Sequence, residues 1–415
     1  MQKIKVLLGI IIITLSLLVP TSGSAAIFTP NVEARAALLV DFKTGQVIAE
    51  KNGSEKLPIA SISKLIVVYM IEEMISEGKI TLETPVKVSK ELATFSQDSS
   101  VANTPLAEGR EYSVADLINA AMLPSSNSTA MVLAEVVAGS QSKFYQKADQ
   151  LISTWGITGV NLVTASGLPN GSLENLKNKS LPDDAENKLS ARDVAIIAHH
   201  LVQKYPEILK VSSQKEVSFP GIRGHPIQLK STMPIIGAAT SYNFTGLKTG
   251  LTANDGTTFV GIATYQTRQV ITVVLDTGKD SKYLQVFDQT KELLTQTDAQ
   301  AKLTKYDTKT FNQSVTVKNA HPQNVKLVLQ KPVYLFIPKN ETVQPDTKNL
   351  IYSIPLIAPI DKDEIVARAE LQFNSAGITD YLGKAPKLSF VSVQKVEEKP
   401  SIYEKIGDWI RNIFK

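Results

Sequence analysis

The sequence predicts an α+β protein in which helices pack on an antiparallel sheet, followed by a small all-β domain and a C-terminal amphipathic helix. Three observations predict this architecture. A hairpin signal near the start and a second pair of strand-like runs enclose several helical segments. Beyond about residue 301, short strand-like runs replace the helical period, which returns only at the end. We expect domains at 27–300 and 301–395, then a linker and helix at 396–415.

The composition is that of an ordinary globular protein. Its 415 residues suffice for two or three domains, with 43% hydrophobic and 20% charged residues. The net charge of +4 is spread thinly, without a run of Lys or Arg, so no nucleic-acid partner is expected. The absence of cysteine excludes disulfides, thiol nucleophiles and thiolate metal sites.

The first residues form three zones. Lys3 and Lys5 precede an apolar run at 6–19, and small residues follow Pro20. This pattern is typical of a secretory signal peptide, residues 1–26, and therefore of an exported protein. The run is short for a membrane span and ends at a proline, which favours cleavage over an uncleaved signal anchor.

The first elements after the signal are a hairpin and an apolar helix. Strand-like runs at 35–40 and 46–50 flank a turn with Gly45. A helix is expected after Ser61, ending near Gly78. It carries few charges before Glu72, so most of its circumference should be buried, as in a central core helix.

Further helices are expected at 117–123, 128–137 and 194–204. Two of them begin with capping boxes, Ser113 with Asp116 and Ser190 with Asp193, in which side chain and backbone satisfy each other's hydrogen bonds.

The remainder of the main domain combines a long loop with a hairpin. The stretch 164–189 is rich in Gly, Asn, Pro and Ser, which predicts a long surface excursion. Adjacent antiparallel strands are expected at 257–264 and 268–275, and a helix at 281–295 closes the region. The result is a sheet with helices packed on it.

Residues 301–395 contain strand-like runs at 313–317, 325–329, 333–337, 350–354, 365–373 and 388–393. Turn residues and prolines separate them at the spacing expected of a small β-sandwich. No cluster of chemically active residues occurs here, so we interpret the region as a spacer or docking domain.

Apolar residues recur on one side of the last segment, at Ile402, Ile406, Trp409, Ile410, Ile413 and Phe414. A helix of this segment is about 22 Å long, too short and too charged to span a bilayer. We expect an in-plane anchor on a membrane surface. The alternative is a helix packed on the β domain.

Ser61 and Lys64 are candidates for a nucleophile and its base. Three positions apart at a helix start, the two side chains share a face, and the helix N-terminus favours developing negative charge. The same spacing occurs at 76–79, 140–143, 212–215 and 392–395, so Ser61 could also be a plain helix-start residue. The four histidines show no triad-like or metal-ligand pattern, and no phosphate-cradling glycine loop exists. We expect no metal or cofactor, which leaves a serine enzyme with a lysine base.

The motifs that complete such a site occur in order as Ser61-Ile62-Ser63-Lys64, Ser125-Ser126-Asn127 and Lys248-Thr249-Gly250. This set is shared by class A β-lactamases and penicillin-binding proteins. Lys-Thr-Gly also occurs at 43–45, but there it precedes the nucleophile and lies on a turn. The stretches 164–168, 190–193 and 246–252 resemble the low-molecular-mass D-alanyl-D-alanine carboxypeptidases, as do the trailing β domain and final helix. This resemblance covers nearly the whole mature chain and implies a β-lactamase/penicillin-binding-protein-like transpeptidase fold.

The resemblance also implies an activity. A serine-type D-Ala-D-Ala carboxypeptidase would trim peptidoglycan stem pentapeptides at the outer face of the bacterial cytoplasmic membrane, and β-lactams would acylate it. Ser61 would attack, Lys64 would act as general base and Ser125 would relay the proton to the leaving amine. The implied substrate-binding residues are Asn127, Lys248, Thr249 and Gly250, and the backbone N–H groups of Ser61 and Leu251 would form the oxyanion hole.

Two departures favour a peptidase over a β-lactamase. Ser126 stands where class A β-lactamases carry Asp. No clear counterpart of their deacylating glutamate is evident at 164–189, although Glu174 and Glu186 lie there. The alternatives are a β-lactamase or transpeptidase on the same fold, and a catalytically silent wall-binding protein.

Overall fold

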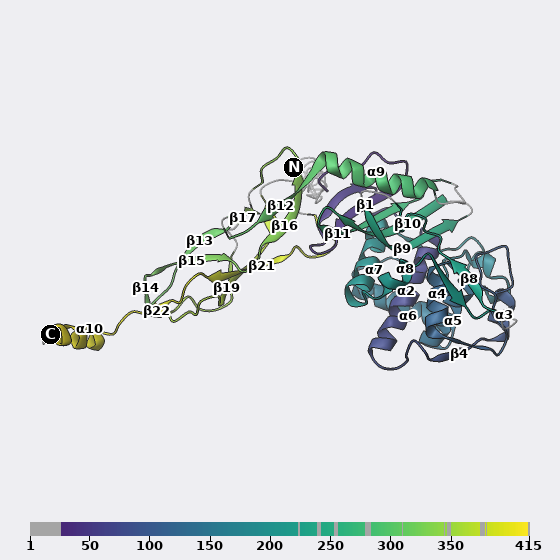
Figure 1. The fold of residues 1–415 in the computed structure, drawn as a ribbon, viewed down its shortest axis with the longest axis horizontal. Coiled ribbons are helices and arrows are strands. Elements are labelled where there is room, and N and C mark those ends of the chain that lie inside the picture. The colour runs from purple at the N-terminus through teal and green to yellow at the C-terminus, as the bar shows by residue number, and fades with distance from the viewer. Residues whose placement is uncertain are drawn as a thin grey trace, which may run out of the picture.

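The computed structural model describes residues 26–222, 225–238, 242–252, 256–278, 284–308, 310–343, 345–346, 350–373, 378 and 380–413. Most helices and the largest sheet lie at one end of an elongated molecule, a β-rich region extends from them, and helix α10 (Ile402–Ile413) lies at the other end (Figure 1). The predicted signal peptide, apart from Ala26, falls outside the described residues.

The central sheet is antiparallel, in the order β2-β1-β11-β10-β9. Its strands are β1 (Ala36–Asp41), β2 (Val47–Lys51), β9 (Asn243–Thr252), β10 (Gly256–Tyr265) and β11 (Arg268–Leu275). Leu38 and its β11 partner Val273 belong to one hydrophobic cluster, whereas Leu39 and Val274 belong to another on the opposite face. Because successive residues face opposite sides of a sheet and both sides are covered, these strands are continuously apolar rather than alternating.

Helices cover both faces of this sheet (Figure 1). The helices that contribute to the Leu38 cluster are α2 (Lys64–Ser76), α3 (Lys90–Phe95), α4 (Val114–Met122), α5 (Asn127–Ala138), α6 (Gln141–Thr154), α7 (Ala191–Lys204) and α8 (Ile208–Ser212). The opposite face is covered by α9 (Leu284–Gln300), whose Val286 and Phe287 join the Leu39 cluster.

The central helix is confirmed. Every residue of α2 from Lys64 to Ile71 is buried, residues 72–75 are partly buried, and Ser76 at the end of the helix is exposed. Both predicted capping boxes are present, Ser113 with Asp116 at α4 and Ser190 with Asp193 at α7.

The short elements are η1 (Ala60–Ser63), η2 (Asn170–Leu176), and the strand pairs β3 (Leu57–Pro58) with β6 (Lys188–Leu189), β4 (Pro85–Lys87) with β5 (Glu111–Ser113), and β7 (Glu216–Phe219) with β8 (Ile227–Lys230). One prediction is corrected here. The stretch 164–189 is not simply a surface excursion, because Ser166, Asn170 and Asn187 within it are buried.

The β-rich region has its own core. Its strands are β12 (Ala301–Tyr306), β13 (Asn312–Thr316), β14 (Ala320–His321), β15 (Asn324–Leu329), β16 (Val333–Pro338), β17 (Pro345–Asp346), β18 (Ile351–Tyr352), β19 (Ile365–Glu370), β20 (Gln372–Phe373), β21 (Lys387–Ser392) and β22 (Glu397–Glu398). Five of them form a sheet in the order β13-β15-β21-β19-β18, around a cluster that includes Leu327, Val366 and Phe390. Each of the predicted runs contains a strand. The sequence does not predict β12, which pairs with β16.

Buried polar contacts join this region to the central sheet. Gln46 beside β2 makes two hydrogen bonds with the backbone of Phe336, one accepted at Oε1 (2.9 Å) and one donated from Nε2 (2.8 Å). Arg192 of α7 forms ion pairs with both Glu50 and Asp380. Such paired contacts fix the orientation of the two regions, because separating them would leave Gln46 and Asp380 as buried polar groups without these partners.

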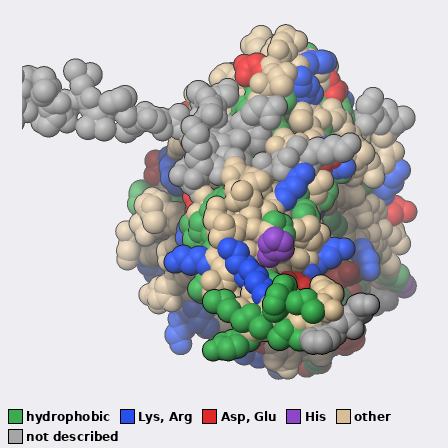
Figure 2. Space-filling view, turned by 90° about the vertical axis from the view of Figure 1, so that its left-hand side faces the viewer, with side chains coloured by type: hydrophobic (Ala, Val, Ile, Leu, Met, Phe, Trp, Pro, Cys, Tyr) green, Lys and Arg blue, Asp and Glu red, His purple; other side chains and the backbone are tan. Residues whose placement is uncertain are grey.

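The last helix exposes its apolar side chains. Trp409 is 65% exposed and Ile402 is 74% exposed, with Tyr403, Ile406, Ile410 and Ile413 also exposed. Figure 2 looks onto this end of the molecule and shows hydrophobic side chains gathered beside Lys and Arg. In this structure the helix therefore does not bury its apolar side against the β-rich region. Among the described residues, no helix has both the length and the apolarity needed to cross a bilayer.

Candidate active site

The nucleophile turn, residues 59–63, leads directly into α2. Ala60 to Ser63 form the 3₁₀ helix η1 and α2 begins only at Lys64, so Ser61 lies in a 3₁₀ turn before the α-helix rather than at its first position. Side chains three apart eclipse in 3₁₀ geometry. The Nζ atom of Lys64 consequently lies 2.7 Å from Ser61 Oγ. Ala60 takes a left-handed backbone conformation (φ +47°), a strained one of the kind concentrated at functional sites.

The amine of Lys64 is fully buried and has three partners. Besides Ser61 Oγ, Nζ lies 2.8 Å from Asn127 Oδ1 and 2.8 Å from the carbonyl oxygen of Ser166. Burial, and secondarily the charge of Lys248, holds the pKa of Lys64 well below its ordinary value. A neutral amine has two N–H donors and one lone pair. With the donors on Asn127 and Ser166, the lone pair faces Ser61.

Ser125 and Lys248 form the second half of the site. Ser125 precedes α5 with a left-handed backbone (φ +66°), and Lys248 Nζ lies 2.9 Å from its Oγ. Lys248 also contacts its neighbour's carbonyl, Thr249 O, at 3.2 Å. Burial lowers the pKa of Lys248 to about 7. Both lysines are buried and the charge of Lys248 acts on Lys64, so carrying two positive charges at once in this site is unfavourable.

Ser126, the middle residue of the second motif, helps to fix the start of α5. Ser126 precedes α5, and its Oγ accepts a hydrogen bond from Thr104 N (2.9 Å). The Asn127 backbone N–H donates to Ala102 O (2.8 Å). These bonds fix the start of α5, so the Asn127 side chain is held toward Lys64.

The third motif lies inside strand β9. Thr249 is buried, and its Oγ1 lies 2.7 Å from that of Thr232. A Cβ at Gly250 would lie 2.7 Å from the Ile59 carbonyl oxygen, so only glycine lets β9 pass this close to the nucleophile turn. Leu251 is 40% exposed at the end of the strand. The motif thus forms one wall beside Ser61.

Three residues that the sequence reasoning did not assign contribute to this site. Ser166 supplies a carbonyl to Lys64, Thr232 pairs with Thr249, and Asn187 bonds the nucleophile turn. The stretch 164–168 was part of the resemblance, which is the only sequence signal for Ser166. Its Gly167 (φ +86°) lies so close to the nucleophile turn that a Cβ would be 1.8 Å from Ala60 O.

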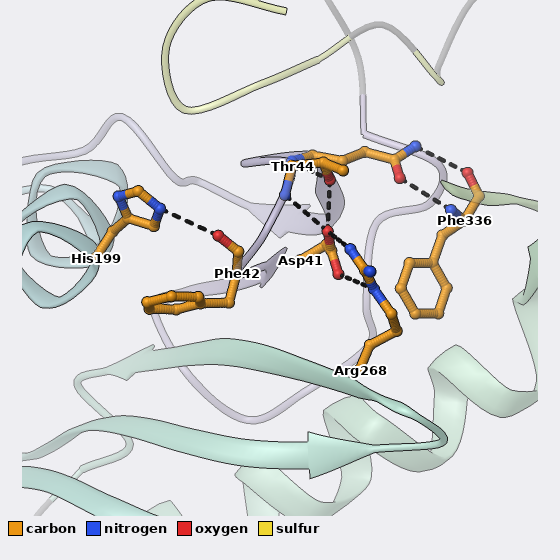
Figure 3. Close-up of polar contacts among 7 residues, drawn as sticks. Asp41, Phe42, Thr44, His199, Arg268 and Phe336 are labelled. Carbon is orange, nitrogen blue, oxygen red and sulfur yellow. Dashed lines mark hydrogen bonds and ion pairs between the residues drawn. The ribbon is translucent and has the colours of Figure 1, made fainter. Parts of the chain in front are cut away.

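The duplicate motifs lie elsewhere. In the turn copy of Lys-Thr-Gly, Thr44 donates through N–H and Oγ1 to Asp41, which also pairs with Arg268 (Figure 3). The Nε2 atom of His199 lies 3.0 Å from the Phe42 carbonyl oxygen, and Figure 3 shows this contact beside the same turn. Within the described residues, no group of three or more His, Asp or Glu side chains could hold a metal ion.

Residues 23–279 match the peptidase S11 family, described as D-alanyl-D-alanine carboxypeptidase, and residues 299–398 match the C-terminal domain of penicillin-binding protein 5. The chain is 31% identical to the D-alanyl-D-alanine carboxypeptidase DacC of Escherichia coli over 68% of this chain and 66% of that protein. It is 26% identical to DacA of the same organism over 93% of this chain and 89% of that protein.

Two solved structures are similar as well. The superposition on the peptidoglycan synthesis regulatory factor PBP3 of Streptococcus pneumoniae spans 88% of this chain and 100% of that one, with 30% identity and a TM-score of 0.77. The superposition on penicillin-binding protein D2 of Listeria monocytogenes, in its ampicillin-bound form, spans 64% of this chain and 98% of that one. The identity is 26% and the TM-score is 0.51.

Proposed function

The chain belongs to the peptidase S11 family of D-alanyl-D-alanine carboxypeptidases, and from this premise we propose that it releases the terminal D-alanine of peptidoglycan stem pentapeptides through an acyl-enzyme on Ser61. One observation carries the proposal. The buried amine of Lys64 contacts Ser61 Oγ, and its pKa is lowered by burial and by a second buried lysine that contacts Ser125. An activated serine with a separate proton relay is what amide hydrolysis by acyl transfer requires.

Acylation uses both lysines in different charge states. Neutral Lys64 takes the Ser61 proton while Oγ attacks the carbonyl of the penultimate D-alanine. The backbone N–H groups of Ser61 and Leu251 stabilise the oxyanion. As the intermediate collapses, the C–N bond breaks and Ser125 passes a proton to the leaving D-alanine amine. Charged Lys248 with Thr249 and Gly250 holds the terminal carboxylate, and Asn127 positions the peptide.

Water then hydrolyses the acyl-enzyme and regenerates Ser61. A β-lactam has a cyclic amide and a carboxylate like those of the dipeptide, so it should acylate the same oxygen, as the ampicillin-bound form of the Listeria relative supports for this fold. The hydrogen-bond partners of Lys64 are a serine, an amide and a carbonyl, with no carboxylate among those described. We therefore infer slow deacylation of the penicilloyl enzyme rather than β-lactamase turnover.

The direct test is D-alanine release from an N-acylated peptide ending in D-Ala-D-Ala. Stoichiometric release with each turnover supports the carboxypeptidase. Transfer of the acyl group to an added amine without free acid would identify a transpeptidase, and rapid loss of penicillin would identify a β-lactamase. A protein that does none of these would be catalytically silent.

We expect kcat/KM to depend on pH through Lys64 and Lys248. Activity should rise with pH as Lys64 becomes neutral, and should fall above about pH 7 as Lys248 loses the proton that pairs with the substrate carboxylate. In Lys248→Arg, the fall of kcat/KM at alkaline pH should move above the pH range of the assay, because guanidinium stays charged. The maximal activity of this variant should be lower than that of wild type. Lys43→Arg, in the turn copy of the motif, serves as the control and should keep the wild-type profile. A fall near pH 7 that persists in Lys248→Arg would assign it to another group.

We propose that the protein is exported and rests on the outer face of the cytoplasmic membrane through α10. The support is the exposed apolar side chains of this helix, including Ile402, Trp409 and Ile413. Deleting 401–415 should reduce the fraction that sediments with vesicles of phosphatidylglycerol and phosphatidylethanolamine by about tenfold or more. Penicillin acylation should be unchanged in the deletion variant, which controls for folding. Undiminished sedimentation of that variant would contradict the anchor.

A further inference from the structure

The buried side chain of Asn187 joins the nucleophile turn to the segment that contains Val163 and Thr164, and both segments lie beside the proposed general base Lys64. It lies just before β6 and is 1% exposed. Its Oδ1 accepts from the backbone N–H groups of Val163 (2.6 Å) and Thr164 (3.3 Å). Its Nδ2 donates to Ser63 Oγ (2.9 Å) and to Thr164 O (2.8 Å). Both donors and both acceptor sites of the amide are therefore used, and one partner belongs to the nucleophile turn.

The turn that follows Thr164 presents the carbonyl of Ser166 to Lys64. Within it, Thr164 Oγ1 accepts from Gly167 N (2.9 Å) and donates to Leu168 O (2.9 Å). On the other side, Ser63 Oγ donates to Ala60 O (2.7 Å), and the Ile59 N–H donates to the Asn187 backbone carbonyl (3.2 Å). A continuous set of hydrogen bonds thus runs from the nucleophile turn through Asn187 to the turn that carries Ser166.

The direction of the Lys64 lone pair depends on this geometry. A neutral amine points its lone pair at Ser61 only while its two N–H groups are held by Asn127 Oδ1 and Ser166 O. If the Ser166 carbonyl moved relative to the nucleophile turn, the amine would rotate and its proton-accepting orbital would miss Ser61 Oγ. Misplacement by about 1 Å can cost about 10²-fold in rate.

We propose that Asn187 is a positioning residue for the general base: its amide fixes the Ser166 carbonyl against the nucleophile turn and so aims the lone pair of Lys64 at Ser61. The inference rests on the proposed function, since only a neutral Lys64 acting as base needs this orientation. Asn187 lies outside the three motifs, and its side chain is hydrogen-bonded to Val163, Thr164 and Ser63 rather than to Lys64 or Ser61. Its effect should therefore fall on the acylation step and not on ligand binding.

The test is stopped-flow acylation by penicillin of the full chain, across pH, for wild type and Asn187→Asp. The introduced carboxyl group, while protonated, can accept from Val163 and Thr164 and donate to Thr164 O, whereas its ionised form opposes that carbonyl. The ratio of variant to wild-type acylation rate constants should thus fall by about tenfold or more as pH rises through the pKa of the introduced carboxyl group. The dissociation constant of the initial penicillin complex should stay unchanged. Asn187→Leu, which is uncharged, should be slow at every pH, by about 10²-fold.

Asn170→Asp is the matched control. Asn170 is fully buried in the same excursion, and its side chain bonds Asn178, Leu181 and Pro182 but nothing in the nucleophile turn. For Asn170→Asp, the ratio of variant to wild-type acylation rate constants should not change with pH, even if the thermal stability of the variant falls. A flat ratio for Asn187→Asp, or an equal fall for Asn170→Asp, would overturn the proposal.

Two further measurements separate the possible failures. Ser63→Ala removes one Asn187 contact from the other side and should slow acylation several-fold. If the Asn187 variants do not fold, a wild-type rate in Ser63→Ala overturns the proposal. A wild-type protein that penicillin does not acylate would instead contradict the proposed function itself.

Discussion

Ser61→Ala is expected to abolish the covalent adduct with penicillin and to reduce D-alanine release by about 10⁴-fold or more. The reason is that no other hydroxyl among the described residues is hydrogen-bonded to the Lys64 amine. Intact-mass measurement after incubation with penicillin gives the result directly. Wild type should gain the mass of one β-lactam and the variant should gain none.

Ser140→Ala is the control, because Ser140 begins another Ser-x-x-Lys stretch. Its Oγ accepts from the Lys143 backbone N–H at the start of α6, which is a helix-capping role. That variant should keep the full adduct and lose at most about 1–2 kcal/mol of stability. An adduct that survives in Ser61→Ala would move the nucleophile to another residue.

Replacing the base should have the second-largest effect. Lys64→Met keeps most of the buried volume but removes the proton acceptor, so acylation by penicillin should slow by about 10²–10⁴-fold. The free energy of unfolding should not fall greatly, because the variant no longer keeps an amine out of water beside a second buried lysine. Loss of activity with retained stability is the signature of a residue placed for catalysis rather than for folding.

Acylation rates and chemical denaturation should be measured on the same preparations. Lys79→Met, from the Ser-x-x-Lys copy at 76–79, is the matched control, since Lys79 is exposed and pairs with Glu77. It should acylate at the wild-type rate. A Lys64→Met protein that acylated within about threefold of wild type would show that another group takes the Ser61 proton.

Much of the fold was predictable from local patterns. An apolar run with few charges predicted α2, the capping boxes placed the starts of α4 and α7, and alternation of strand-like runs with turns predicted the β-rich region. The exceptions have physical causes. Residues 164–189 lack any period, because their order comes from buried side chains such as Asn170 and Asn187 bonding irregular backbone. Nothing local distinguishes that arrangement from a solvent-exposed loop.

The candidate site shows the same division. The sequence by itself determined the identities and order of Ser61, Lys64, Ser125 and Lys248, because spacing within one turn and membership of a motif are local properties. Only the tertiary structure decided which carbonyl faces the base and which amide fixes that carbonyl. Ser166 acts through its backbone, which every residue has, and Asn187 lies far along the chain from Lys64. Such contacts arise when β3 and β6 pair and bring the two segments together, so no short stretch of sequence encodes them.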